Sequence, residues 1–223
     1  MQARHEFKHS LNYMYYVLLR NRLRAVLPHD DYVGPGGEYR IRSLYFDTPG
    51  DRALREKIDG VNRREKFRIR YYNGDPSFLR LEKKSKVNGL CYKQSDSISR
   101  EESRLLADGD LDWMVQDERP LVTELYSKMK GQLLRPKSVV DYIREPFVFR
   151  AGNVRITLDR DIRTGLFSTD FLDADLPTIS AGDEIVLLEV KYDAFLPGFI
   201  ADLIQVGNRR ATACSKYALC RTY

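Results

Sequence analysis

Residues 65–84 read EKFRIRYYNGDPSFLRLEKK, and this stretch decides the fold. In a β-strand, side chains two residues apart point to the same face. The predicted strand Glu65–Tyr72 therefore has one face that carries Lys66, Arg68 and Arg70. The predicted strand Phe78–Lys84 has one face that carries Arg80, Glu82 and Lys84. The residues between them are mostly apolar, so each strand concentrates its charge on one side.

The same alternation recurs in other parts of the chain. One face carries Glu189 and Lys191, another carries Arg155, Thr157 and Asp159, and an extended segment 4–8 would add Arg4, Glu6 and Lys8. A half-buried antiparallel strand with a solvated charged face would explain any one of these segments. A solvated face would more often include Thr, Ser and Gln, however, and Glu-x-Lys occurs on three separate strands. We therefore expect the charged faces to line one closed or nearly closed barrel, with helices outside.

The remaining pattern indicates an α+β protein. Helical spacing and capping signals predict helices over Leu11–Leu27, after Ser99, over Pro120–Lys130 and over Gly198–Val206. Further strands are predicted over Tyr39–Asp47, Leu90–Ser95, Val139–Ile143, Val154–Asp159 and Ile185–Tyr192. Because these strands do not alternate regularly with helices, a mostly antiparallel sheet or barrel is favoured over a doubly wound sheet. No linker divides the chain, so one domain over residues 1–223 is expected.

The composition is that of an ordinary soluble protein. Of 223 residues, 43% are hydrophobic and 31% are charged, with 37 Lys and Arg against 32 Asp and Glu. No run of about 18 uncharged apolar residues occurs, so no direct membrane span is expected. The start of the chain has no apolar signal segment, and the three cysteines show no metal-binding spacing. These features predict a cytoplasmic protein with reduced thiols.

A lumen lined by lysines and arginines would require a highly charged ligand. Clustered cations repel one another and lose hydration, and a chain of phosphates would relieve both costs through charge-assisted hydrogen bonds. A few carboxylates among the cations would suit a divalent metal that bridges phosphate oxygens. Neither of the glycine-rich phosphate-binding motifs occurs, so side chains would have to hold any nucleotide.

Short motifs in a fixed order carry a family resemblance. They are RHEFK at 4–8, SLYFDT at 43–48, FRIRYY at 67–72, LEKK at 81–84, VRITLD at 154–159, LEVK at 188–191 and SKY at 215–217. In these motifs the chain resembles the triphosphate tunnel superfamily, which is named for adenylate cyclases and thiamine triphosphatases. Within that superfamily it is most similar to the polyphosphate polymerase domain of the vacuolar transporter chaperone (VTC) family.

The resemblance implies a tunnel of about eight antiparallel strands that binds ATP and polyphosphate. It also implies a phosphotransferase that moves the γ-phosphate of ATP to a growing polyphosphate chain and releases ADP. The implied phosphate-binding residues are Lys8, Arg68, Arg70, Lys84, Lys93, Arg144, Arg155, Lys191 and Lys216. Among them, Arg68, Arg70, Lys84 and Lys216 form the implied catalytic group. Glu189 is the implied ligand of Mn²⁺ or Mg²⁺, with Glu82 and Asp159 as further candidates.

One position departs from the family pattern. A basic residue three positions before Lys216 is usual, and Ala213 stands there. Arg209 or Arg210 could replace it, although an altered tunnel mouth would affect activity more than fold. Yeast-like members of the family work within membrane assemblies, so any membrane partner of this chain is expected to be a separate polypeptide.

Other functions fit parts of the sequence. A tunnel triphosphatase would use the same cations with water as nucleophile, and a non-catalytic module would only bind polyphosphate. The segment His5-Glu6-Phe7-Lys8-His9 matches the zinc-hydrolase pattern H-E-x-x-H. Tyr71 and Tyr72 beside basic strands could stack on single-stranded nucleic acid. Glutamates on the same faces would repel a nucleic-acid backbone, so no nucleic-acid partner is expected.

Overall fold

The computed structural model describes residues 4–182, 185–205 and 214–222. Its strands are β1 His5–Leu11, β2 Tyr39–Asp47, β3 Arg64–Tyr72, β4 Asp75–Val87, β5 Leu90–Ile98, β6 Arg135–Phe149, β7 Val154–Thr164, β8 Ile179–Ser180 and β9 Val186–Tyr192. Its α-helices are α1 Tyr13–Val26, α2 Arg52–Ile58, α3 Arg100–Asp108, α4 Pro120–Gly131, α5 Gly198–Leu203 and α6 Lys216–Leu219. The predicted α+β class is thereby confirmed.

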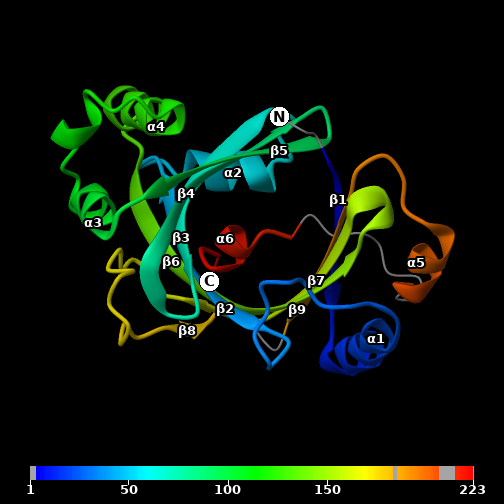
Figure 1. Ribbon diagram of the computed structural model, residues 1–223. Helices are drawn as coiled ribbons and strands as arrows, with labels where there is room; N and C mark the ends of the chain where they lie inside the picture. The colour runs from blue at the N-terminus through cyan, green and yellow to red at the C-terminus, as the bar shows by residue number, and fades with distance from the viewer. Residues whose placement is uncertain (1–3, 183–184, 206–213, 223) are drawn as a thin grey trace.

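Eight strands form one curled antiparallel sheet in the order β1-β9-β7-β6-β2-β3-β4-β5, and the short β8 pairs with β7 (Figure 1). The two edge strands do not pair along their length. They meet at one isolated bridge, in which the backbone N of Arg4 lies 3.3 Å from the carbonyl oxygen of Cys91. The expectation of a closed barrel was therefore wrong in this respect, because the ladder ends in an open seam between β1 and β5.

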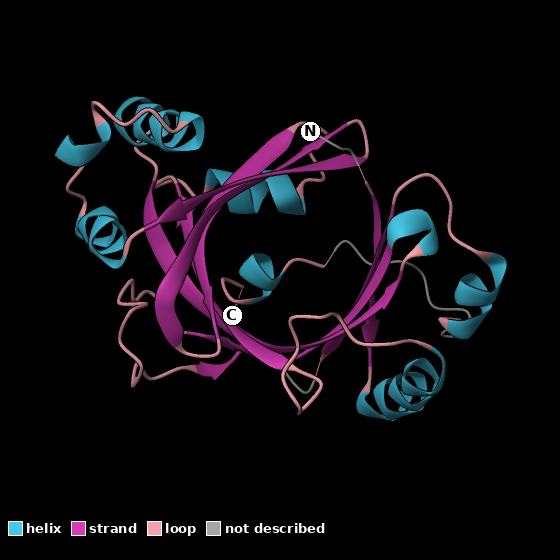
Figure 2. Cartoon of the chain, viewed as in Figure 1, coloured by secondary structure: helices cyan, strands magenta, loops and turns pink. Residues whose placement is uncertain are grey.

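Helices cover the apolar outside of the sheet, and one helix lies within its curve (Figure 2). Leu121 and Leu125 of α4 pack against Phe67 and Leu81 of the sheet, in one buried cluster. Helix α1 packs its buried face against β7 and β9 in a second cluster. Helix α6 lies in the hollow of the sheet, where the ring of Tyr217 stacks on that of Tyr45 with centroids 5.1 Å apart.

Two Asn-Gly turns set the registers that bring the charged faces together. Asn73-Gly74 joins β3 to β4 and Asn88-Gly89 joins β4 to β5, and all four residues have positive φ. Such turns match the twist of the two strands they connect. The resulting pairing places Arg68 opposite Glu82, so the two strands point their charges to the same face.

Local signals fixed several element boundaries. The predicted strand Tyr39–Asp47 is confirmed to the residue, and the Ser99 and Glu102 side chains form the expected capping box. The predicted helix start at Leu11 was wrong, because the Asn12 side chain accepts a hydrogen bond from the Tyr15 backbone and Leu11 belongs to β1. The sequence prediction also missed α2 and α6.

Candidate functional site

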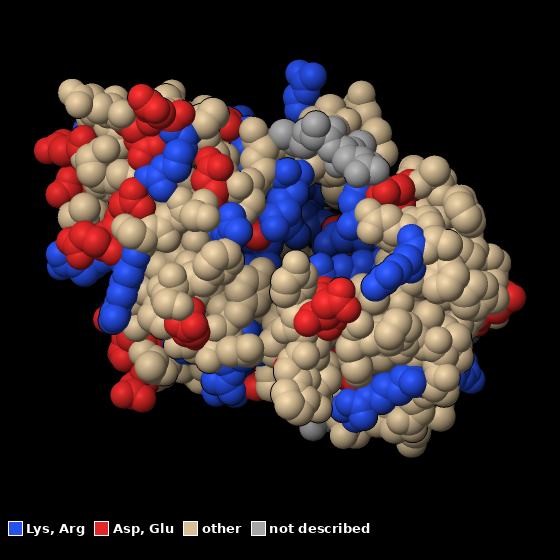
Figure 3. Space-filling model, viewed as in Figure 1, with Lys and Arg blue, Asp and Glu red and all other residues tan. Residues whose placement is uncertain are grey.

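The curled sheet encloses a cavity of about 550 Å³, here called the tunnel cavity. Thirteen cations line it, and they are Arg4, Lys8, Lys57, Arg64, Lys66, Arg68, Arg70, Lys84, Lys86, Lys93, Arg144, Arg155 and Lys191. Among the residues that the structure describes, three of the lining residues are acidic, namely Glu6, Glu65 and Glu189. The space-filling view shows lysines and arginines gathered in the central hollow (Figure 3). The charged strand faces thus point inward, as the alternation predicted.

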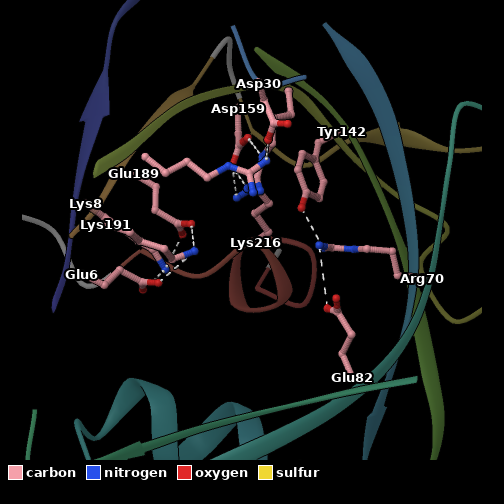
Figure 4. Close-up of polar contacts among 12 residues, drawn as sticks. Glu6, Lys8, Asp30, Arg70, Glu82, Tyr142, Asp159, Glu189, Lys191 and Lys216 are labelled. Atoms are coloured by element: carbon pink, nitrogen blue, oxygen red, sulfur yellow. Dashed lines mark hydrogen bonds and ion pairs between the residues drawn. The ribbon is translucent and has the colours of Figure 1, made fainter. Parts of the chain in front are cut away.

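Glu189 and Glu6 share two lysines at one side of the cavity (Figure 4). Lys8 Nζ lies 2.7 Å from Glu6 Oε1 and 3.1 Å from Glu189 Oε2. Lys191 Nζ contacts Glu189 and lies 3.3 Å from Glu6 Oε2. Burial and the mutual repulsion of the two carboxylates would raise the pKa of Glu6, but Lys8 and Lys191 outweigh them and lower it to about 2. Both carboxylates are therefore ionised at neutral pH.

Asp159 holds a second ionic cluster behind the cavity surface. The Arg144 guanidinium donates from Nε and Nη2 to the two carboxylate oxygens over 2.6 and 2.7 Å, and Lys216 contacts the same carboxylate. Asp159 is fully buried. Burial would raise the pKa of its carboxyl, yet Arg144 and Lys216 lower it to about 2. Lys216 Nζ also lies 4.5 Å from the centroid of the Tyr142 ring.

Glu82 anchors the arginines of β3. Arg68 Nε donates to Glu82 Oε2 over 2.7 Å, and Lys93 Nζ lies 2.5 Å from Glu82 Oε1. Arg70 is held mainly by hydroxyls, since its Nη2 donates to the Tyr142 hydroxyl over 2.8 Å and its Nε to Ser43 Oγ over 3.0 Å. The Tyr45 hydroxyl accepts from Arg68 Nη1 over 2.9 Å. Both guanidiniums are thus fixed in orientation at the lumen wall.

The cavity-lining cations of α2, of the start of β3 and of the end of β4 have no such partners. Among the described residues, no carboxylate makes an ion pair with Lys57, Arg64, Lys66, Lys84 or Lys86. Lys84 faces Lys66 across one strand boundary and Lys93 across the other. The pKa of Lys84 is held well below its ordinary value by Lys191 and by burial. We call these five residues the unpaired wall, and we call Glu6, Lys8, Arg144, Asp159, Glu189 and Lys191 the paired wall.

The structure brings most of the predicted site residues into one cavity. Lys8, Arg68, Arg70, Lys84, Lys93, Arg144, Arg155, Lys191 and Glu189 line it. Glu82, Asp159 and Lys216 do not line it: Glu82 and Asp159 are buried in ion pairs behind the wall, and Lys216 is a half-buried partner of Asp159. Ala213, Arg209 and Arg210 fall outside the described residues.

Sequence reasoning missed three lining cations. Lys86 continues the alternation of Glu82 and Lys84, and Arg64 continues that of Lys66, so a longer strand prediction would have found both. Lys57 lies on α2, whose segment ALREKI carries helix-favouring residues but no strong capping signal. Its position in the lumen depends on tertiary packing, which a local pattern does not reveal.

The acidic residues fit a divalent cation together with phosphate. Within the described part of the chain, no group of three or more His, Cys, Asp and Glu side chains could hold a metal by itself. Mg²⁺ is commonly bound by one or two carboxylates, waters and substrate phosphates. Glu6 and Glu189 provide two carboxylates, and the buried Thr157 Oγ1, opposite Glu189 in the β7–β9 register, has no hydrogen-bond partner among the described residues. These donors fit such a mixed site.

The structure contradicts the zinc-site interpretation and bears on one of the two tyrosines of the nucleic-acid interpretation, since Tyr72 lines the tunnel cavity and Tyr71 does not. The H-E-x-x-H segment lies in the extended strand β1, so His5 and His9 are separated by about 13 Å at 3.3 Å per residue instead of one helical turn. Glu6 and Lys8 face the lumen in this strand. Tyr71 belongs to the outer core, where its hydroxyl donates to the Phe171 carbonyl oxygen over 2.7 Å. That ring offers no stacking surface to a base.

Comparisons with known proteins agree with this architecture. A Bacillus halodurans protein provisionally described as an adenylate cyclase has a TM-score of 0.51 at 14% identity, covering 86% of this chain and 82% of its own. The PH1012 protein of Pyrococcus horikoshii has a TM-score of 0.52 at 13% identity, covering 98% of this chain and 99% of its own. At these identities the likeness shows the fold alone.

Three further findings complete the comparison. None of the curated proteins searched matches the sequence. No helix in the described part of the chain is both long and apolar enough to cross a membrane. The family model of the VTC domain matches residues 3–223. The chain therefore belongs to the VTC domain family, and the predicted triphosphate tunnel resemblance is confirmed.

Proposed function

We propose that this protein binds ATP and polyphosphate in the tunnel cavity and transfers the γ-phosphate of ATP to the end of the polyphosphate chain. The observation that carries the proposal is the charge of the cavity lining, with thirteen cations against three carboxylates. Cations that are partly removed from water without counterions are costly, and five of these cations are half-buried and have no acidic partner among the described residues. A chain of phosphates supplies the missing negative charge.

The lumen suits phosphate oxygens better than isolated carboxylates. Arg68 and Arg70 hold their guanidiniums in fixed orientations, which favours the two-pronged hydrogen bonding that phosphate accepts. Lys84 and Lys66 supply point charges on the adjacent rung. The flexible amines of these two lysines could bind a polyphosphate chain in several positions as it grows.

The transfer needs no covalent nucleophile from the protein. A terminal oxygen of the polyphosphate chain attacks the γ-phosphorus in line, the bond to the β–γ bridging oxygen breaks, and ADP leaves with the electron pair. Arg68, Arg70 and Lys84 would stabilise the charge that spreads over the transferring group. Lys216 does not line the cavity, so we assign it the role of a positioning residue that fixes Arg144 through Asp159.

Glu189 and Glu6 would hold Mn²⁺ or Mg²⁺ beside the reacting phosphates. A divalent cation there supplies neutralising charge to the phosphate oxygens. Lys8 and Lys191 occupy both carboxylates in the ligand-free protein. We infer that incoming phosphates draw these lysines away, which makes carboxylate oxygens available to the cation.

A product assay tests the proposed function. Purified protein is incubated with ATP and Mn²⁺, and ADP, orthophosphate and polymer are measured together. Polymer formed in step with ADP supports phosphate transfer to a chain. Orthophosphate without polymer would show that the protein is a hydrolase and refute the proposal. ADP release no greater than in the absence of protein would show that the protein only binds polyphosphate.

A further inference from the structure

A second cavity of about 400 Å³ adjoins the tunnel cavity between α2, α4 and the start of β3. We call it the side cavity. Its own lining includes Arg52, Glu56, Arg63, Lys83 and Lys128. Five residues line both cavities, namely Ala53, Arg64, Glu65, Lys66 and Ser85. The two spaces therefore meet along a boundary that itself carries two cations.

The cations of the side cavity fall into two groups. Its deeper lysines are neutralised, since Lys83 Nζ lies 3.1 Å from Glu65 Oε2 and Lys128 contacts the same carboxylate. Arg63 and Arg64, in contrast, make no ion pair with any described residue, and Arg64 donates only to the Val61 carbonyl oxygen. The uncompensated charge thus lies on Arg64, which also lines the tunnel cavity, and on the preceding residue, Arg63.

This uncompensated charge is continuous with that of the tunnel. Arg64 lies opposite Lys86 in the β3–β4 register. Burial first, and then the charges of Arg64, Lys8 and Lys86, lower the pKa of Lys57. Cations from α2, β3 and β4 are therefore close enough to repel one another where the tunnel passes into the side cavity.

The lining of the side cavity favours a bare phosphate chain over a nucleotide. Its aromatic residues, Phe46 and Phe67, are buried in the outer core, so they present no open ring face to a base. A flexible polyanion needs only cations at intervals along its path. The path from Lys84 and Lys66 in the tunnel to Arg64 and Arg63 provides them.

We propose that the side cavity is a second anion-binding site, which takes the phosphates of a long linear polyphosphate that extend past the tunnel cavity, with Arg63 and Arg64 as their ligands. The inference rests on the proposed function, because it requires polyphosphate in the tunnel. The proposed site predicts that affinity for polyphosphate continues to increase with chain length after the chain is long enough to fill the tunnel cavity.

The test compares two ligands on three proteins. Calorimetry at one salt concentration measures the affinity for tripolyphosphate and for long-chain polyphosphate of the unaltered protein, Arg63→Glu and Arg100→Glu. Arg63 is exposed and lines only the side cavity, so its substitution leaves the tunnel lining intact. Arg100 is an exposed cation on α3 outside both cavities, so Arg100→Glu controls for net charge.

We expect Arg63→Glu to weaken long-chain binding about fivefold or more and to change tripolyphosphate binding less than about twofold, with Arg100→Glu close to the unaltered protein for both. Equal weakening of both ligands by Arg63→Glu, or no weakening beyond the control, would overturn the side-cavity site. If tripolyphosphate itself does not bind the unaltered protein, the proposed function of the tunnel fails instead.

Discussion

The two walls of the tunnel cavity carry similar cations in opposite electrostatic states. On the paired wall, Lys8 and Lys191 contact two carboxylates, and Arg144 lies against Asp159. On the unpaired wall, Lys66 and Lys84 face each other on neighbouring strands, and no carboxylate of the described residues makes an ion pair with either. The cations of the paired wall thus have counter-charges from the protein, whereas those of the unpaired wall would receive theirs from a bound anion.

This difference separates two tasks that one cationic tunnel has to perform. Carboxylates on the paired wall fix the positions of its cations, and under the proposed function they would provide oxygens for a metal. The cations of the unpaired wall repel one another, and a bound anion would relieve this repulsion. Removing a charge from the paired wall should therefore lower stability, whereas removing a cation from the unpaired wall should raise stability and lower affinity for the anion. Substitutions can test that contrast.

The largest effect is expected from Asp159→Asn on the paired wall. The substitution leaves Arg144 and Lys216 buried without a full counter-charge, and breaking a buried ion pair typically costs about 3–5 kcal/mol. Denaturant unfolding measures the loss. Asp161→Asn, an exposed aspartate on the same strand, is the matched control and should cost under about 1 kcal/mol.

The pH dependence of unfolding adds a check on Asp159. Because its folded pKa of about 2 lies below the usual value of about 3.9, its contribution is complete above pH 4 and is lost as the pH falls from 4 to 2. Asp159→Asn should make the free energy of unfolding less dependent on pH between pH 4 and pH 2. An unchanged slope would show that the paired wall is not held by this carboxylate.

Glu189→Gln should lower turnover about 100-fold or more, because it removes the proposed metal ligand without removing a cation. Affinity for tripolyphosphate should persist or rise, since a negative charge leaves the lumen. Product formation and calorimetry on the same preparation give both quantities. Glu124→Gln, which removes a partner of Lys83 outside the tunnel, serves as control. Unchanged turnover in Glu189→Gln would refute the metal assignment.

Local alternation made the paired strands predictable, whereas tertiary packing decided the rest. Glu82 meets Arg68 because β3 and β4 are joined by a tight turn, and a strand period of two already places both on the inward face of the sheet. The ion pair of Asp159 with Lys216 depends on α6, a four-residue helix without a side-chain cap. Its position follows from the stacking of Tyr217 on Tyr45, which no short-range pattern encodes.

Lys84→Gln, on the unpaired wall, should stabilise the protein, whereas Asp159→Asn on the paired wall should destabilise it. Removing one of the three lysines that face one another across β3, β4 and β5 should raise the free energy of unfolding by up to about 1 kcal/mol. Tripolyphosphate affinity should fall about tenfold, with a weaker dependence on salt, because a charge-assisted hydrogen bond is lost. A variant that loses both stability and affinity would contradict the contrast between the walls.

The smallest effect is expected in the pH dependence of binding. Burial and the charges of Lys8 and Arg68 lower the pKa of Lys66 to about 8, although Tyr45 opposes the shift. A bound polyanion favours the protonated amine, so the contribution of Lys66 to affinity should be complete well below pH 8. It should weaken by up to about tenfold per pH unit above that value, as the free protein loses the proton.

Two substitutions, Lys66→Arg and Tyr45→Phe, distinguish the effect of Lys66 deprotonation on affinity from that of ionisation of the neighbouring Tyr45 phenol. Burial opposes ionisation of Tyr45, but Arg68 and Lys66 lower its pKa to about 7, so its negative charge would also weaken anion binding as the pH rises. Arginine keeps its charge over this whole pH range, so Lys66→Arg should reduce the loss of affinity above pH 8. Tyr45→Phe should instead reduce the loss of affinity between pH 6 and 8. If neither substitution alters the profile of tripolyphosphate affinity, the anion does not contact this part of the unpaired wall.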